Sequence, residues 1–208
     1  METHLQTILK ENSLENWYIV RDMFSEEEVQ KIEQDVRNLP SKDATTLGGE
    51  VGQGDYRIST VKWLPQFDSS NWKWIYHRMW KWAKIANDEN WNFDIMGWKD
   101  SPQYTHYAFP DGHYDYHMDC CGEGINHRKI SMSILLQEAE SGGTMQLLYG
   151  REPYSIDLSR GDAVIFPSFV LHRVTRILSG ERKSLVSWIS GNPYKLILLN
   201  RNGLKLMP

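Results

Sequence analysis

The sequence predicts a mainly β protein with flanking helices, in which the second half forms an antiparallel barrel or sandwich and helices of the first half pack against its outside. Three observations lead to this α+β interpretation. Apolar residues recur at helical spacing in two segments before residue 90. From Gln103 onward, short segments rich in Tyr, Val, Ile and Leu are separated by Gly, Asp and Ser turns. No Pro-, Gly- or Ser-rich linker divides the two halves.

Length and composition are those of one globular domain. The 208 residues, 40% hydrophobic and 24% charged, carry a formal net charge of −4, which disfavours a general nucleic-acid binder. No run of about 18 apolar residues is present to span a membrane. The N-terminus lacks the basic and apolar regions of a secretion signal. We therefore expect a single domain over residues 1–208, a cytoplasmic location, and no nucleic-acid or membrane partner.

The first half begins with a short strand and a capped helix. Residues 17–20, Trp-Tyr-Ile-Val, are typical of a strand. Ser25 and Glu28 have the spacing of a capping box, in which each side chain accepts a hydrogen bond from the other residue's backbone N–H. An apolar stripe follows at helical spacing and predicts a helix that Pro40 terminates: Val29, Ile32, Val36 and Leu39.

A polar loop over 41–54, a strand over 57–64 and a second helix come next. The helix is predicted to begin near Ser70 or Asn71 and to end near Asn87. One face is apolar (Trp72, Ile75, Tyr76, Met79, Ala83 and Ala86), and the opposite face is mostly basic (Lys73, His77, Arg78, Lys81 and Lys84). Such a basic, Trp-bearing helix could contact nucleic acid by charge and stacking. We favour an amphipathic helix laid against a sheet, because the apolar spacing accounts for the pattern unaided.

The second half consists of predicted strands over 103–109, 113–119, 129–137, 143–149, 162–166, 170–177 and 182–189. Short strands at this spacing indicate an antiparallel barrel, whose open mouth can hold a ligand or metal. We therefore divide the chain into helical support and lead-in strands (1–100), a barrel core that carries the site (101–192) and a C-terminal segment (193–208).

A His-x-Asp pair within this core predicts a metal site. Residues two apart in a strand point to the same side, so His117 and Asp119 direct an imidazole and a carboxylate into one interior. A second histidine from a neighbouring strand would complete the two-His-one-carboxylate arrangement of non-haem Fe(II) oxygenases. His113 and Asp115 have the same spacing, so the pair alone does not identify the site.

Residues downstream supply the third ligand and an anion anchor. His172 follows the apolar strand that begins after the Gly161-Asp162 turn, where the chain turns back. On the returning strand, Arg182 and Ser184 share one face and would lie deeper in the barrel than the metal. A guanidinium fork beside a hydroxyl matches the distal carboxylate of a 2-oxo diacid.

Taken together, these motifs resemble the prolyl 4-hydroxylase-like branch of the Fe(II)/2-oxoglutarate dioxygenases. The resemblance covers about residues 103–190, and the lead-in over 17–39 is also similar. The family places one Tyr ten residues before the metal His and another three before it; Tyr107 and Tyr114 meet both spacings from His117 and neither from His113. The remaining matches are Gly112, Gly142-Gly143, residues 161–166, His172, Gly180, Arg182 and Ser184.

The resemblance implies a double-stranded β-helix, a cupin-like jelly roll, and an enzyme that hydroxylates a C–H bond. Fe(II) would be held by His117, Asp119 and His172, which are therefore the expected catalytic residues. The cosubstrate 2-oxoglutarate would be anchored by Arg182, with help from Ser184 and Tyr107. O2 is the second cosubstrate, ascorbate is a further expected ligand, and succinate and CO2 are the products. The expected substrate is a prolyl residue in a peptide or protein. Many animal and plant members have Lys at the position of Arg182, whereas bacterial and viral members have Arg there, as this chain does.

Two other functions stay open from the residues. The same site could act on a free amino acid or another small molecule, which requires a closed pocket rather than a groove lined by loops such as 41–55. A non-catalytic cupin-like barrel could instead sense a metal or a small acid. For substrate contacts, the candidates are Tyr114, Arg57, Trp63 and the rim residue His113, and Trp98 is either a groove or a core residue.

Structural roles and a second metal site were weighed against these assignments. His172 could be a hydrogen-bonded core histidine, and Arg182 a surface residue whose neighbour Lys183 anchors the diacid. Cys120 and Cys121 are adjacent, which suits a reducing compartment better than a disulfide scaffold. A zinc site formed by these cysteines with His113 and His127 is disfavoured, because adjacent cysteines rarely bind one tetrahedral ion.

Overall fold

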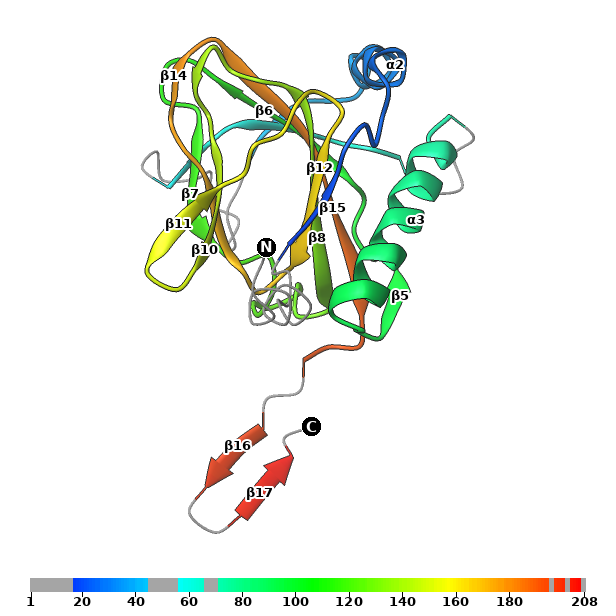
Figure 1. The fold of residues 1–208 in the computed structure, drawn as a ribbon, viewed down its shortest axis with the longest axis vertical. Coiled ribbons are helices and arrows are strands. Elements are labelled where there is room, and N and C mark those ends of the chain that lie inside the picture. The colour runs from blue at the N-terminus through cyan, green and yellow to red at the C-terminus, as the bar shows by residue number, and fades with distance from the viewer. Residues whose placement is uncertain (1–16, 45–55, 66–70, 195–196, 201–202, 207–208) are drawn as a thin grey trace, which may run out of the picture.

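The computed structural model describes residues 17–44, 56–65, 71–194, 197–200 and 203–206. Two helices, α2 (Glu26–Val36) and α3 (Lys73–Asn90), accompany the strands (Figure 1). The strands are β1 (Tyr18–Val20), β2 (Lys42–Asp43), β3 (Arg57–Ile58), β4 (Thr60–Trp63), β5 (Ile95–Gly97), β6 (Gln103–Ala108), β7 (His113–His117), β8 (Arg128–Gln137), β9 (Ser141–Gly142), β10 (Met145–Tyr149), β11 (Glu152–Ser155), β12 (Ala163–Pro167), β13 (Leu171–Val174), β14 (Ile177–Ser179), β15 (Glu181–Gly191), β16 (Ile197–Asn200) and β17 (Gly203–Leu206).

Two antiparallel sheets enclose a common interior (Figure 1). The larger sheet has the strand order β1-β12-β8-β15-β6-β4-β2, and β5 pairs with β15 at its side. The smaller has the order β11-β10-β13-β7-β3. Two short pairs, β9 with β14 and β16 with β17, complete the strand pairing. The predicted mainly β architecture with helices on the outside is therefore confirmed.

The larger sheet is buried on both faces because helices cover one face and the smaller sheet covers the other. On β8, Ile134 and Leu136 join the apolar core that contains the inner faces of α2 and α3. Leu135, between them, packs instead with Met145 and Leu147 of β10. This alternation explains why β8 is almost continuously buried while only every second side chain points toward the interior.

Helix α2 has the predicted capping box. The Ser25 hydroxyl accepts from the N–H of Glu28 at 3.3 Å, and the Glu28 carboxylate accepts from the N–H of Ser25 at 3.0 Å. The helix ends at Val36, before the predicted end at Pro40, because Lys62 donates to the terminal carbonyl groups of Val36 and Arg37, both at 3.0 Å. A lysine at the end of a helix stabilises its terminal carbonyl acceptors.

Helix α3 starts and ends later than predicted. Its N-cap, Trp72, makes no side-chain capping bond, and its last residue is Asn90 rather than Asn87. Asn87 is buried and exchanges two hydrogen bonds with the backbone of Phe93, so its side chain folds the segment after the helix back onto α3. The predicted apolar face is buried in full, from Trp72 to Ala86. In the part of the chain described, no helix is long and apolar enough to cross a membrane.

Two predicted strands prove to be two strands each. The 57–64 strand divides at Ser59: β3 pairs with β7 in the smaller sheet, and β4 pairs with β6 in the larger one. The 170–177 strand likewise divides into β13 and β14, which belong to different sheets. The sequence interpretation did not anticipate β5, β11 or the β16–β17 hairpin. Most of the predicted 41–54 loop lies outside the described residues, and residues 42–43 form β2.

Candidate metal centre

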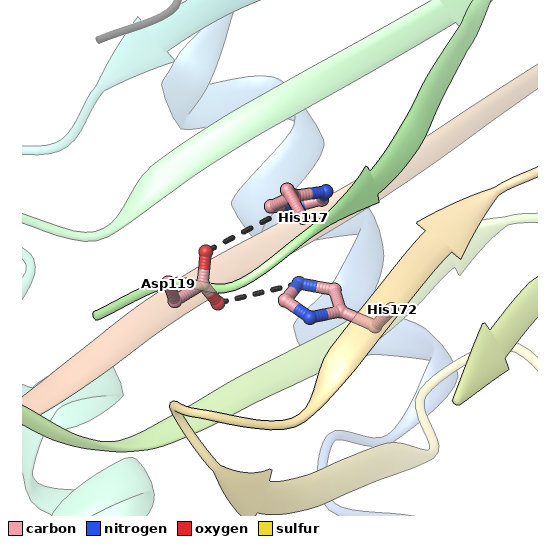
Figure 2. A group of neighbouring side chains, drawn as sticks. All are labelled: His117, Asp119 and His172. Atoms are coloured by element: carbon pink, nitrogen blue, oxygen red, sulfur yellow. Dashed lines mark ion pairs between the residues drawn. The ribbon is translucent and has the colours of Figure 1, made fainter. Parts of the chain in front are cut away.

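Strand pairing in the smaller sheet brings the three predicted metal ligands together. His172 of β13 lies directly opposite His117 of β7, and Asp119 follows β7 by two residues. The Asp119 carboxylate faces both rings: Oδ1 is 3.7 Å from His117 Nε2, and Oδ2 is 3.4 Å from His172 Nε2 (Figure 2). One ligand atom from each residue lies within 4.8 Å of the others, a separation that allows all three to bind one ion.

Each imidazole is oriented by a backbone carbonyl. His117 Nδ1 lies 2.8 Å from the Asp115 carbonyl oxygen, and His172 Nδ1 lies 2.9 Å from that of Val170. Because a carbonyl only accepts, each Nδ1 carries the proton and each Nε2 keeps its lone pair for a metal. Metal-binding histidines commonly donate the other ring N–H to such an acceptor.

The electrostatics of the group also suit a cation. Burial alone would raise the pKa of Asp119, but His172, His117 and the Ser131 hydroxyl hold it well below its usual range. Burial, followed by the neighbouring His172, lowers the pKa of His117 to about 3. Burial would also lower the pKa of His172, yet the facing Asp119 carboxylate raises it. At neutral pH the group therefore offers a charged carboxylate and a neutral His117.

Two imidazole nitrogens and one carboxylate oxygen are the donor set of a non-haem Fe(II) facial triad. Among the described residues, this is the one group of three or more His, Cys, Asp or Glu ligands close enough to share a metal ion. The zinc grouping is not formed there. His127 Nε2 is 3.0 Å from the Asp100 carboxylate, and the sulfur atoms of Cys120 and Cys121 contact each other at 2.6 Å.

The three residues border a cavity of about 360 Å3 between the sheets. Five residues predicted for substrate or cosubstrate lie in its wall: Arg57, Trp63, Tyr107, Tyr114 and Ser184. His113 is outside this wall. It is buried, its Nδ1 lies 2.6 Å from the Asp111 carbonyl oxygen, and it pairs with Ile58 across the strands. Trp98 packs against Tyr76 of α3 and donates to the Ser187 hydroxyl, so it is a core residue.

Arg182 is buried beside this cavity, not in its wall. It pairs with Tyr107 across β15 and β6 and lies two residues before Ser184, and both of those neighbours line the cavity. Arg182 itself lines an adjoining cavity of about 240 Å3, and Met145 is common to both. Its Nε and Nη2 atoms are buried without a hydrogen-bond partner. A buried guanidinium with two unsatisfied donors fits a ligand carboxylate, because leaving such donors unpaired is costly. Lys183 donates instead to Gln137, at 2.7 Å.

An aromatic ring packs against the candidate metal ligand on β7. The Tyr114 ring stacks on the His117 imidazole, with centroids 3.4 Å apart and planes 16° apart. The Arg57 guanidinium carbon lies 4.4 Å from the centroid of the Tyr114 ring, and Arg57 also donates to the side chains of Gln103 and Ser59. The stack therefore fixes the orientation of the His117 ring from behind.

The cavity wall also contains residues that the sequence motifs did not identify as substrate contacts. Arg128 lies 3.9 Å from the centroid of the Trp188 ring and donates to Asp100 at 2.8 Å. Trp188 shares a strand face with Ser184, a pattern visible in the sequence. Arg128 has no local signal, because its place at the cavity follows from the pairing of β8 with β15.

Less than half of the chain matches a known family model. Residues 102–190 match the family model described as the 2OG-Fe(II) oxygenase superfamily. A PKHD-type hydroxylase of Shewanella baltica is 38% identical over 84 residues, which are 36% of this chain and 37% of that protein. A PKHD-type hydroxylase of Colwellia psychrerythraea is 36% identical over 87 residues, which are 39% of each protein. The match thus spans less than two fifths of the length of these relatives.

Solved structures share the fold over nearly the whole chain. A prolyl-4-hydroxylase from Pseudomonas putida superposes with a TM-score of 0.68 at 16% identity, covering 89% of this chain and 98% of that one. A prolyl hydroxylase from Trichoplax adhaerens, in complex with a hypoxia inducible factor peptide fragment, gives a TM-score of 0.71 at 15% identity, covering 92% and 94%. These similarities confirm the predicted jelly-roll fold.

Proposed function

We propose that this protein, whose residues 102–190 match the family model of the 2OG-Fe(II) oxygenase superfamily, is an Fe(II)- and 2-oxoglutarate-dependent hydroxylase of prolyl residues. One observation carries the proposal: next to the cavity that the His-Asp-His group borders, the buried Arg182 keeps two guanidinium donors without a partner, and its neighbours Tyr107 and Ser184 line that cavity. A metal site alone fits many functions. The added anion anchor fits a cosubstrate that binds the metal at one end and carries a carboxylate at the other.

In this proposal, His117, Asp119 and His172 would hold Fe(II) at the wall of the cavity. Arg182 binds the 5-carboxylate of 2-oxoglutarate. Tyr107 and Ser184, its neighbours in the barrel wall, contact the same cosubstrate. Bound iron and 2-oxoglutarate supply oxidation of a substrate C–H bond by O2, with release of succinate and CO2. The protein's part is to orient the cosubstrate and the substrate carbon and to keep water out of the site.

The substrate is placed at the outer end of the cavity, where the aromatic residues lie. Trp63 is 41% exposed, and its ring lies 6.1 Å from that of the buried Trp188. An exposed indole beside a buried one gives an apolar surface that continues from solvent into the site, which suits a residue held within a peptide. The PKHD-type relatives and the prolyl hydroxylase neighbours support the same substrate class. Arg57, Tyr114 and Trp63 are the proposed contacts. His113 does not line the cavity and is left out of this set.

The metal and cosubstrate are tested first, without turnover. Anaerobic addition of Fe(II) and 2-oxoglutarate should give a weak visible charge-transfer band in wild-type protein. His172→Ala should abolish the band, and His113→Ala should retain it, because His113 is bonded to the Asp111 carbonyl. No band in the wild type would favour the non-catalytic sensor, and loss of the band in His113→Ala alone would mean that the wrong His-x-Asp pair was chosen.

The substrate is tested by coupled turnover. Succinate formation is compared between a panel of proline-containing peptides and free proline, and mass spectrometry checks each product for one added oxygen atom. The proposal expects peptides to stimulate succinate release and to gain the oxygen. Stimulation by free proline or another amino acid, with none by peptides, would replace the peptide substrate by a small molecule.

A further inference from the structure

Two buried serines hold the carboxylate of the metal centre. The Ser131 hydroxyl donates to Asp119 Oδ2 at 2.7 Å and lies 3.0 Å from the Ser168 hydroxyl. Ser131 is 1% exposed and Ser168 is fully buried. Ser168 also accepts, through its backbone carbonyl, the N–H of Asp119 at 2.9 Å. The main chain and the side chain of Asp119 are therefore both fixed by this pair.

The protons in this network can be placed. A serine hydroxyl has one proton and two lone pairs, and an ionised carboxylate can only accept. Ser131 donates to Asp119 Oδ2 at 2.7 Å, so its one hydroxyl proton lies in this bond. The Ser131 oxygen then accepts the hydroxyl proton of Ser168. The chain of donors thus runs from Ser168 through Ser131 to Asp119, and each bond strengthens the next.

The serines come from outside the sheet that carries the histidines. His117 and His172 lie on β7 and β13 of the smaller sheet. Ser131 lies on β8 of the larger sheet, and Ser168 lies in the turn between β12 and β13. The network therefore ties the carboxylate ligand to the opposite wall of the barrel and to the segment that leads to His172.

Packing alone does not require a hydroxyl at position 131. Its neighbours Ile130 and Met132 are fully buried, and an alanine would fill almost the same space. A hydroxyl taken out of water costs free energy unless it finds a partner, and a charged acceptor gives the strongest hydrogen bond. The partner here is the Asp119 carboxylate, so the feature that the hydroxyl adds is its effect on this ligand.

We propose that Ser131, supported by Ser168, is a positioning residue that sets the orientation in which Asp119 offers its oxygen to the metal. The inference rests on the proposed function, since it concerns the same metal centre. Groups that orient metal ligands typically change metal affinity by about 10- to 100-fold when removed. Ser131→Ala should weaken metal binding within this range. Ser168→Ala should weaken it less, because the direct bond from Ser131 remains.

The test uses Co(II) as a spectroscopic probe added to the full-length, metal-free protein. Titration gives the dissociation constant, and the visible d–d absorption reports the ligand geometry. Ser131→Ala is expected to raise the dissociation constant about 10- to 100-fold and to change the absorption bands. Ser131→Thr, which keeps the hydroxyl, should restore most of both. Thermal unfolding of each variant without metal shows that the fold is intact.

Ser187→Ala is the matched control. Ser187 is also fully buried in the larger sheet, but its hydroxyl accepts from the Trp98 indole on the helix-covered side. Its loss should lower stability and leave the Co(II) affinity and spectrum unchanged. The inference is overturned if Ser131→Ala binds Co(II) with wild-type affinity and spectrum while Asp119→Ala has lost binding. If Asp119→Ala also binds like the wild type, the metal centre itself, and with it the proposed function, is wrong.

Discussion

Replacing Asp162 should uncouple the N-terminal strand from the barrel. Its buried carboxylate accepts three hydrogen bonds: Oδ1 from the Asp22 N–H at 2.9 Å, and Oδ2 from the Ser159 N–H at 2.9 Å and from Arg21 at 2.6 Å. Asp22 follows β1, and Asp162 precedes β12, the strand on which β1 pairs. One carboxylate therefore closes the end of the β1–β12 ladder and the 159–162 turn together.

The size of the effect follows from the donors. A hydrogen bond to a charged group contributes about 1.5–3 kcal/mol, whereas an ion pair to an exposed side chain contributes about 0–1 kcal/mol. Arg21 is 57% exposed, so its share is small. Asp22 and Ser159 are exposed, and water replaces part of each lost bond. We expect Asp162→Ala to lower the free energy of unfolding by about 3 kcal/mol, and Asp162→Asn by about 2 kcal/mol because Oδ1 survives.

The same bonds predict a pH dependence of known sign. Burial would raise the pKa of Asp162, but the N–H groups of Asp22 and Ser159 and the Arg21 guanidinium lower it overall. A carboxyl whose pKa is lower in the folded state contributes stability above its unfolded pKa of about 3.9, and this stability is lost as the pH falls through the folded pKa. The difference between wild type and Asp162→Asn should thus be full at pH 7 and shrink below about pH 4.

Urea unfolding followed by tryptophan fluorescence, at pH 7 and at steps down to pH 3, measures this difference. If the free energy of unfolding of Asp162→Asn lies within about 0.5 kcal/mol of that of the wild type at pH 7, the assigned hydrogen bonds are refuted, because an ordinary surface substitution has an effect of that size. A loss of stability that stays constant down to pH 3 would show instead that the charge of Asp162 is not its cause.

Three further predictions concern the turn before Asp162, the cosubstrate anchor and the first helix. Gly161→Ala should lower stability by at least about 2 kcal/mol in thermal unfolding, because Gly161 has φ +90° and a Cβ there would lie 2.2 Å from the Phe24 carbonyl oxygen; an unchanged melting temperature would contradict this. Arg182→Gln should raise the KM for 2-oxoglutarate about 10- to 150-fold in a succinate assay, because a hydrogen bond to a charged group is lost. A KM within twofold of wild type would exclude Arg182 as the anchor. Ser25→Ala should lower the free energy of unfolding in urea by about 1 kcal/mol, because the N-cap of α2 is lost. An unchanged free energy of unfolding would show that Glu27 and Glu28 stabilise the start of the helix without the cap.

The sequence predicted best where local pattern determines structure. The capping spacing of Ser25 and Glu28 located the start of α2, and period-two alternation located β6, β8 and β15 within one or two residues. The placement of His117 and Asp119 followed from the same alternation. Their spacing from Tyr107 and Tyr114 separated them from the His113 pair, and the structure groups them with His172.

Features that depend on distant pairing could not be predicted in this way. The break at Ser59 has no strong turn signal, because it arises where β3 and β4 find partners in different sheets. Ser131 is an ordinary small residue in an apolar run, and its contact with Asp119 exists only after the two sheets face each other. Arg128 reaches the cavity for the same reason. The sequence motif identified the candidate ligands but not the groups that orient them.

The break at Ser59 has a consequence for specificity. Arg57 on β3 and Trp63 on β4 line the cavity from opposite sheets, yet one continuous stretch of chain supplies both. The distance between these two walls is therefore fixed by the backbone path of a few residues, and the Ser59 hydroxyl, which accepts from Arg57 at 2.9 Å, holds the bend. Insertions or substitutions within residues 57–63 would widen or narrow the entrance while leaving the His-Asp-His group untouched, so related chains can diverge in the size of the molecule admitted at this one corner.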